Sequence, residues 1–151
     1  PEDGFDCDQN TFKITGGTII GVGGGTSTPT SKECTQPSLV YGGSGTQNTL
    51  FHISAADGTD VLTFRIPRTL QQMTLLFSSP SLASGASYTI QTGGTATGGT
   101  DFYGLYTGAT YSGGTQAATF TTSSMVTTVG SVSGGIGGGG MGGGGGRPGG
   151  W

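Results

Sequence analysis

The chain has 151 residues, of which 34 are glycine and only 9% are charged, against about a quarter in a typical globular protein. This composition excludes long helices, because glycine is costly in a helix interior and the abundant threonine loses rotamer freedom there. A net charge of −3 with five basic residues argues against a nucleic-acid partner. No apolar run approaches the ~18 residues of a membrane span, so membrane insertion is not expected.

Residues 1–28 predict short strands separated by glycine pairs. In 11–15, Phe12 and Ile14 fall on one face and Lys13 on the other, and 18–22 follows as a buried strand after Gly16-Gly17. Such spacing fits the rungs of a parallel β-helix, whose corners need residues that tolerate positive φ. A β-hairpin explains the same residues about as well.

Half of the acidic residues lie in the first eight positions. Carboxylates gathered at a turn repel one another unless a cation neutralises them, and their hard oxygens suit Ca²⁺. The candidate metal ligands are Asp3, Asp6, Asp8 and Asn10. Their spacing lacks the regularity of an EF-hand loop, and a solvated acidic turn is the alternative interpretation.

The two cysteines, Cys7 and Cys34, are an even number in a chain of low charge that is rich in Thr and Ser. This combination favours an oxidising, extracellular setting and one disulfide between them. Two unpaired thiols, or a bridge between neighbouring subunits, are the alternatives. Neither cysteine has a nearby histidine or a C-x-x-C partner, so no metal or redox role is expected of them.

Residues 29–37 read as a polar linker, and a strand-rich module follows over 38–130. Leu62, Phe64 and Ile66 alternate with polar residues, and Asp57-Gly58 is a good hairpin signal. The candidate strands are 38–41, 49–54, 60–66, 72–78, 87–91, 117–121 and 125–129. Strands at this spacing predict a β-sandwich or an open barrel.

The motif Thr/Ser-Gly-Gly-Thr recurs at 15–18, 92–95, 97–100 and 112–115, and it predicts a repeated tight turn. The only histidine, His52, lies in the predicted strand 49–54 and is expected at the surface or half-buried. No motif marks a spaced carboxylate pair or a G-x-S-x-G nucleophile, so the chain is not expected to be an enzyme.

The segment 101–111 interleaves aromatic residues with glycine. Aromatic rings on such a loop either cover a small core or lie against a sugar ring or a neighbouring subunit. The candidate contacts are Phe102, Tyr103, Tyr106 and Tyr111.

The chain changes character in 131–151, which is mostly glycine. Composition alone is typical of a flexible, extended tail. Because glycine has no side chain to bury, a fixed shape would require backbone contacts with a neighbouring copy or with the tail's own domain. Its candidate anchors are Ile136, Met141, Arg147 and Trp151.

Several segments resemble bacterial secreted proteins known as carbohydrate-binding domain-containing proteins. DGFD (3–6) followed by FKITGGT (12–18) is similar to their β-helix rungs, and 36–130 is similar to their C-terminal module, most specifically GLYTGATYSGGT (104–115) and FTTSSMVTTVG (120–130). The resemblance implies an extracellular right-handed parallel β-helix, calcium at some acidic corners, and binding to plant-type or acidic polysaccharide. It does not imply enzymatic activity.

The chain departs from this pattern because only about one and a half rungs precede the terminal module. The predicted fold is all-β: terminal β-helix rungs (1–28), the linker (29–37), a β-sandwich-like module (38–130) and a glycine-rich tail (131–151). An incomplete solenoid exposes a strand edge, which invites pairing with another chain. We therefore expect an extracellular or cell-surface protein that polymerises with its own copies into a fibre or surface layer through this edge and the tail. The alternative is a calcium-dependent polysaccharide-binding module of a secreted adhesin.

Overall fold

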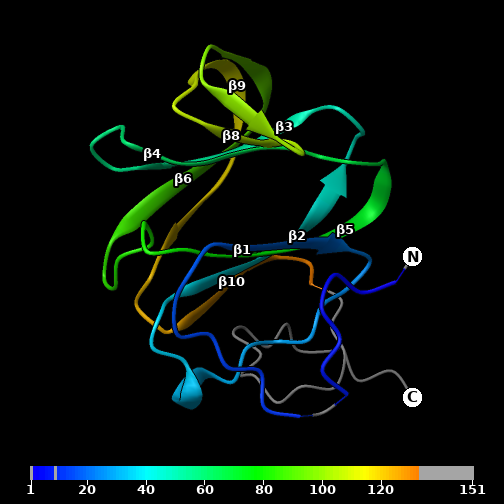
Figure 1. Cartoon of the computed structure of the whole chain (residues 1–151), viewed down its shortest axis with the longest axis vertical. Coiled ribbons are helices and arrows are strands. Elements are labelled where there is room, and N and C mark those ends of the chain that lie inside the picture. The colour runs from blue at the N-terminus through cyan, green and yellow to red at the C-terminus, as the bar shows by residue number, and fades with distance from the viewer. Residues whose placement is uncertain (1, 9, 133–151) are drawn as a thin grey trace, which may run out of the picture.

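The all-β prediction is confirmed by a computed structural model, which describes residues 2–8 and 10–132 (Figure 1). The elements are β1 (Ile19–Gly23), the 3-10 helix η1 (Ser31–Glu33), β2 (Ser38–Gly45), β3 (Leu50–Ala55), β4 (Asp60–Arg65), β5 (Leu70–Ser78), β6 (Ser87–Thr97), β7 (Thr100–Phe102), β8 (Leu105–Thr107), β9 (Thr110–Thr121) and β10 (Val126–Gly130). Over the described ranges, no helix has the length and apolar character that crossing a membrane requires.

The strands form two sheets that face each other (Figure 1). One has the order β1-β5-β2-β10, and the other has the order β7-β8-β4-β3-β6-β9. Among the described strands every pairing is antiparallel except that of β10 with β2, which is parallel. The predicted hairpin at Asp57-Gly58 is confirmed, since it joins β3 to β4.

The main core lies between the two sheets, where the alternating apolar residues of the facing strands meet. It is built mainly from Leu39, Tyr41, Phe51, Ile53, Leu62, Phe64, Leu75, Phe77, Tyr88 and Ile90. Burial of one such side chain contributes about 1.5–3 kcal/mol, so this layer is the principal source of stability.

The segments on either side of β1, residues 2–8, 10–18 and 24–37, cover the other face of the four-stranded sheet, where Ile14 and Thr26 are buried. Gln36 Nε2 donates to Ser78 Oγ of β5 at 2.8 Å. Backbone hydrogen bonds run from Gly24 N to Glu2 O, Gly4 N to Gly25 O, Ser27 N to Phe5 O, Thr30 N to Phe12 O and Thr35 N to Ile14 O. Residues 2–5 and 12–14 therefore run beside 24–35 in the same direction, as an irregular parallel ladder. A turn in which Asn10 N donates to Cys7 O separates the two stretches.

This parallel ladder does not amount to the predicted β-helix. Residues 11–15 form no strand, and β1 pairs antiparallel with β5. The reason is that β1 extends the four-stranded sheet: Ile20 lies opposite Phe77 and Val22 opposite Leu75, and both pack against the main core. Its apolar residues are thereby used by the two-sheet core instead of by a solenoid.

The predicted disulfide is not formed, and Cys7 and Cys34 are both free. They lie at different points of the ladder. The backbone N–H of Cys7 donates to Ser27 Oγ at 2.9 Å, whereas buried Cys34 Sγ accepts from Ile14 N at 3.4 Å. Cys7 thus lies beside Ser27, whereas the Cys34 thiol lies beside Phe12 and Ile14, so different residues surround the two cysteines.

The β6–β9 hairpin is much longer than predicted. Two copies of the Thr/Ser-Gly-Gly-Thr motif, 92–95 and 112–115, face each other within its ladder, with Gly93 opposite Gly114. These two copies therefore lie within bent strands and do not form the predicted tight turns. Gly93, Gly94 and Gly113 have positive φ where the strands bend. The far end of the hairpin carries β7 and β8, and β8 pairs with β4 at a single point, Leu105 with Phe64.

Candidate functional site

The β7–β8 hairpin presents two aromatic side chains to solvent. Phe102 is 68% exposed and Tyr103 is 90% exposed, and they are the exposed large hydrophobic residues of the described part of the chain. Their ring centroids lie 4.8 Å apart in an edge-to-face arrangement. Exposed aromatic pairs of this kind are typical of binding surfaces.

The turn of this hairpin holds the aromatic pair in an unusual backbone conformation. Tyr103 has φ 50° and Gly104 has φ 93°, which is the left-handed region at both central positions. A non-glycine residue held there costs on the order of 1 kcal/mol. Asp101 Oδ1 supports the turn by accepting a hydrogen bond from Gly104 N at 2.7 Å.

Arg65 of β4 fixes the hairpin to the rest of the sheet. Its Nη1 donates to Asp101 Oδ2 and to the Tyr106 hydroxyl, each at 2.8 Å, and its guanidinium lies 5.7 Å from the centroid of the Tyr106 ring. The Gly104 N–H, and then the Arg65 guanidinium, lower the pKa of Asp101 below its ordinary value. The carboxylate therefore stays ionised, and the aromatic tip is held in place before any ligand binds.

An apolar groove of about 440 Å³ lies beside the tip. Its lining residues come from the tip itself, from β1, from β4 and from the N-terminal segment: Phe5, Thr18, Ile19, Ile20, Phe64, Phe102, Tyr103 and Leu105. Of these lining residues, the sequence predicts only Phe102 and Tyr103 as contact residues. A usable signal was the Tyr103-Gly104 pair between two short Thr-containing strands, which is a two-residue hairpin pattern.

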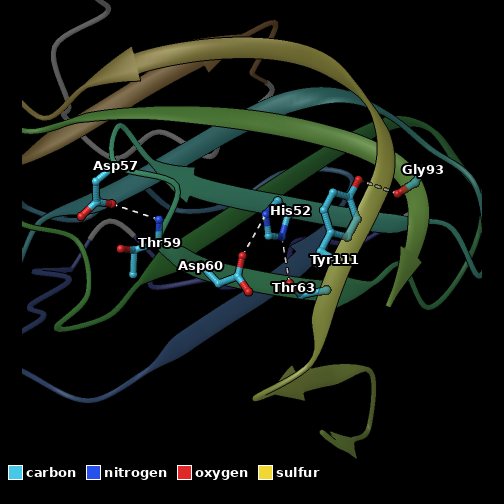
Figure 2. A network of polar contacts seen from close by, with 7 residues as sticks. All are labelled: His52, Asp57, Thr59, Asp60, Thr63, Gly93 and Tyr111. Carbon is cyan, nitrogen blue, oxygen red and sulfur yellow. Dashed lines mark hydrogen bonds and ion pairs between the residues drawn. The ribbon is translucent and has the colours of Figure 1, made fainter. Parts of the chain in front are cut away.

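The four predicted contact aromatics separate into three places. Phe102 and Tyr103 form the exposed tip, while Tyr106 packs against Arg65. Tyr111 lies on the His52 ring, with the ring centroids 3.9 Å apart and an interplanar angle of 14° (Figure 2). Tyr111 is therefore part of the internal packing of the six-stranded sheet.

His52 is 3% exposed, contrary to the predicted surface or half-buried position. Its Nδ1 lies 2.8 Å from Thr63 Oγ1 and its Nε2 lies 3.4 Å from Asp60 Oδ1, while the Tyr111 hydroxyl donates to Gly93 O at 2.6 Å (Figure 2). Burial lowers the pKa of His52, and the nearby Asp60 charge opposes that shift in part. The bend of the β6–β9 hairpin is the cause of this burial, because it places Tyr111 over β3.

Thr63, His52 and Asp60 are connected in the order hydroxyl, imidazole and carboxylate that activates a nucleophile in some enzymes. Here, however, the Thr63 side chain is buried and Tyr111 lies flat on the imidazole. The Thr63 hydroxyl therefore pairs with Nδ1 of a buried histidine, as buried polar groups require, and the Asp60 carboxylate lies 3.4 Å from its Nε2.

The acidic segment near the N-terminus is exposed at Asp3, Asp6, Asp8 and Asn10. Asp8 N donates to Asp6 Oδ1 at 3.1 Å, so one carboxylate supports a local turn. Within residues 2–8 and 10–132, no three His, Cys, Asp or Glu side chains are gathered as a metal site would need. The calcium site stays a prediction. The predicted tail anchors Ile136, Met141, Arg147 and Trp151 lie outside the described residues.

Comparisons with protein-family models, curated proteins and solved structures found no match to this chain. The resemblance to secreted carbohydrate-binding domain-containing proteins therefore stays a prediction from its sequence segments.

Proposed function

We propose that this chain is a non-enzymatic extracellular protein that self-associates through the outer backbone edge of residues 2–14. The glycine-rich tail would supply a second contact, so that pairs of molecules extend into a fibre or surface layer. The observation that supports this proposal is the parallel ladder between 2–14 and 24–35, because it engages only one edge of the 2–14 segment.

The outer edge of this segment is available for pairing. In the described residues, the ladder uses backbone groups of Glu2, Gly4, Phe5, Phe12 and Ile14. On the opposite side, Asp3, Thr11 and Lys13 are exposed, and no backbone hydrogen bond within the described residues engages their main chain. An edge of unpaired N–H and C=O groups is a template for another strand.

Charge gives this pairing a direction. Asp3 and Lys13 carry opposite charges near the two ends of the edge. When two copies meet antiparallel about a two-fold axis, Asp3 of each copy lies near Lys13 of the other. A two-fold contact closes on itself and gives a dimer, so a fibre requires the second contact that we assign to the tail.

A charge-exchange experiment tests the edge. We expect Asp3→Lys alone and Lys13→Asp alone each to weaken dimerisation about tenfold, since two exposed ion pairs of about 0.5 kcal/mol are lost and like charges are opposed. The double variant Asp3→Lys/Lys13→Asp restores the pairs and is expected to dimerise like the unmodified chain. Sedimentation velocity at low and high salt measures these differences.

Asp57→Lys is the matched control for Asp3→Lys, because it changes the net charge by the same amount at the exposed β3–β4 turn and should leave dimerisation unchanged. A chain that stays monomeric at all concentrations, or a double variant no better than either single one, would refute pairing through residues 2–14.

The aromatic tip favours a second candidate function, binding of a polysaccharide. In this function, the acidic segment near the N-terminus would bind calcium and binding of the polysaccharide would be calcium-dependent. A rigid, exposed aromatic pair beside an apolar groove offers flat surfaces for the C–H faces of sugar rings. We expect Tyr103→Ala and Phe102→Ala to reduce binding to cellulose, pectin or acidic sugars at least tenfold. Tyr111→Phe keeps the ring on His52 and serves as the control with unchanged affinity.

A glycan array probed with and without calcium measures this binding. If no glycan binds, or if Tyr111→Phe loses as much glycan affinity as Tyr103→Ala and Phe102→Ala, sugar recognition at the tip is contradicted. Either outcome would leave the charge-exchange result unaffected.

A further inference from the structure

A crevice of about 230 Å³ separates β4 from β8 beyond the single point where these strands pair. Residues 60–63 line one side and residues 105–109 line the other, and Phe77, Ser79 and Ser81 belong to the wall contributed by the opposite sheet and the segment after it. Pockets for drug-sized molecules are typically ~300–1,000 Å³. The crevice is therefore suited to a smaller ligand, about the size of one sugar ring.

The lining of the crevice combines hydroxyl groups with one carboxylate. The hydroxyl-bearing residues of the lining are Thr18, Thr63, Ser79, Ser81, Tyr106 and Thr107. Two of these hydroxyls already have partners, since Thr63 Oγ1 contacts His52 Nδ1 and the Tyr106 hydroxyl accepts from Arg65 Nη1. Asp60 is the charged residue of the lining, and Leu62, Phe77 and Leu105 are its larger apolar side chains. Such a surface matches a ligand with several hydroxyls and one positive charge.

The charge of Asp60 is only weakly compensated within the protein. Its side chain is 51% exposed, and its contact with His52 Nε2 is 3.4 Å, longer than the ~2.7–2.9 Å of a charge-assisted hydrogen bond. Because burial lowers the pKa of His52, the imidazole is neutral at pH 7. Among the described residues, no lysine or arginine forms an ion pair with Asp60.

The walls of the crevice are fixed by contacts outside it. On the β8 side, Arg65 donates to both Asp101 and Tyr106. On the β4 side, residues 60–65 are paired with β3. A preformed site loses little conformational entropy on binding, so even a small ligand can be recognised.

We propose that the crevice between β4 and β8 binds a small hydroxylated organic cation, with its ammonium group on the Asp60 carboxylate and its hydroxyls on the surrounding Ser and Thr side chains. The crevice adjoins the groove beside the aromatic tip, with which it shares Thr18 and Leu105, but neither Phe102 nor Tyr103 nor any residue of the 2–14 edge lines it. Binding at Asp60 can therefore be tested independently of both functions proposed above.

The single histidine of the chain makes the test direct. Because His52 contacts both Asp60 and Thr63, its ring resonances in NMR report occupation of the crevice. Three probes separate the contributions: glucosamine carries the amine and the hydroxyls, glucose carries only the hydroxyls, and ethylamine carries only the amine. At pH 7.5, we expect glucosamine to shift the His52 resonances in a saturable way, with at least tenfold higher affinity than either other probe.

Asp60→Asn is expected to weaken glucosamine binding at least tenfold, and Ala109→Trp, which fills the crevice, is expected to abolish it. Asp57→Asn is the matched control, because this nearby carboxylate is not part of the crevice lining and accepts from Thr59 N in the β3–β4 turn. The methyl resonances of Ile53 and Ile90 in the core verify that each variant is folded. Equal binding of glucose and glucosamine, an unaffected Asp60→Asn variant, or no saturable shift with any probe would each overturn the proposal.

Discussion

His52 occupies the face of β3 that points away from the main core, yet it is one of the most buried polar residues of the protein. Two neighbours on β4, Thr63 and Asp60, meet its nitrogens, and Tyr111 of β9 covers its ring. Removing water from an ionisable group disfavours its charged form. The neutral imidazole is thus part of the folded structure, which makes stability depend on pH.

We expect the free energy of unfolding to decrease as the pH falls from 7.5 to 5.5. The pKa of His52 is lowered in the folded protein, so below the ordinary pKa of 6.5 the unfolded chain binds a proton that the folded chain resists. This loss continues until the pH reaches the folded pKa, whereas above 6.5 His52 contributes no pH dependence. Urea unfolding at pH 7.5, 6.5 and 5.5 measures the slope.

His52→Gln is the control for this experiment, since it removes the only histidine while keeping a polar side chain. The variant is expected to be less stable overall but to lose the slope between pH 7.5 and 5.5. An unmodified chain whose stability rises over that interval on acidification would contradict the burial of a neutral imidazole.

At the scale of the elements, strands with large alternating side chains were predictable and strands without them were not. Leu62 and Phe64 in β4, and Leu75 and Phe77 in β5, mark one face at a period of two, and both face the core. The outer half of the β6–β9 hairpin, 92–97 and 110–116, consists mainly of Gly, Thr and Ser, with Tyr111 as its one large side chain. Its backbone ladder defines these strands, and a backbone ladder leaves no apolar signature in the sequence.

The candidate site was predicted in part for a related reason. Composition located the aromatic residues 102–111, but their directions depend on the turn at Tyr103-Gly104 and on the bend at Gly93 and Gly113. That bend sends Tyr111 inward to His52 and leaves Tyr103 exposed. From the sequence, Asp60 is interpreted as a turn residue and Arg65 as a partner for an acidic sugar or a neighbouring subunit's carboxylate. Their actual partners, His52 and Asp101, could not be predicted because they lie on other strands.

The N-terminal region was likewise predicted only in part, because its outcome depends on a distant partner strand. The pattern around Phe12 and Ile14 correctly indicates a segment with one inward side, since Ile14 is 1% exposed. Whether β1 stacks in a solenoid or joins a sheet is decided by its partner, β5, more than fifty residues away. Local periodicity does not encode that choice.

At the scale of the whole molecule, the fold is closed by a contact between distant parts of the chain. β10 is placed beside β2 in parallel, and Gly42 lies so close to the chain leaving β10 that a Cβ at this position would overlap the carbonyl of Ser131. Glycine at 42 thus allows the last described residues to pack on the first strand of the sandwich. The same junction leads directly into the 131–151 tail.

We expect Gly42→Ala to lower the free energy of unfolding by about 1–3 kcal/mol, the usual cost of forcing an extra methyl group into a packed backbone contact. Gly16→Ala is the matched control: a Cβ there meets open space and its φ is not left-handed, so its effect should be near zero or slightly stabilising. Urea denaturation of both variants at pH 7.5 measures the difference. Equal stability of the two would mean that β10 does not hold this register against β2 in solution, and the tail would then leave the domain at another point.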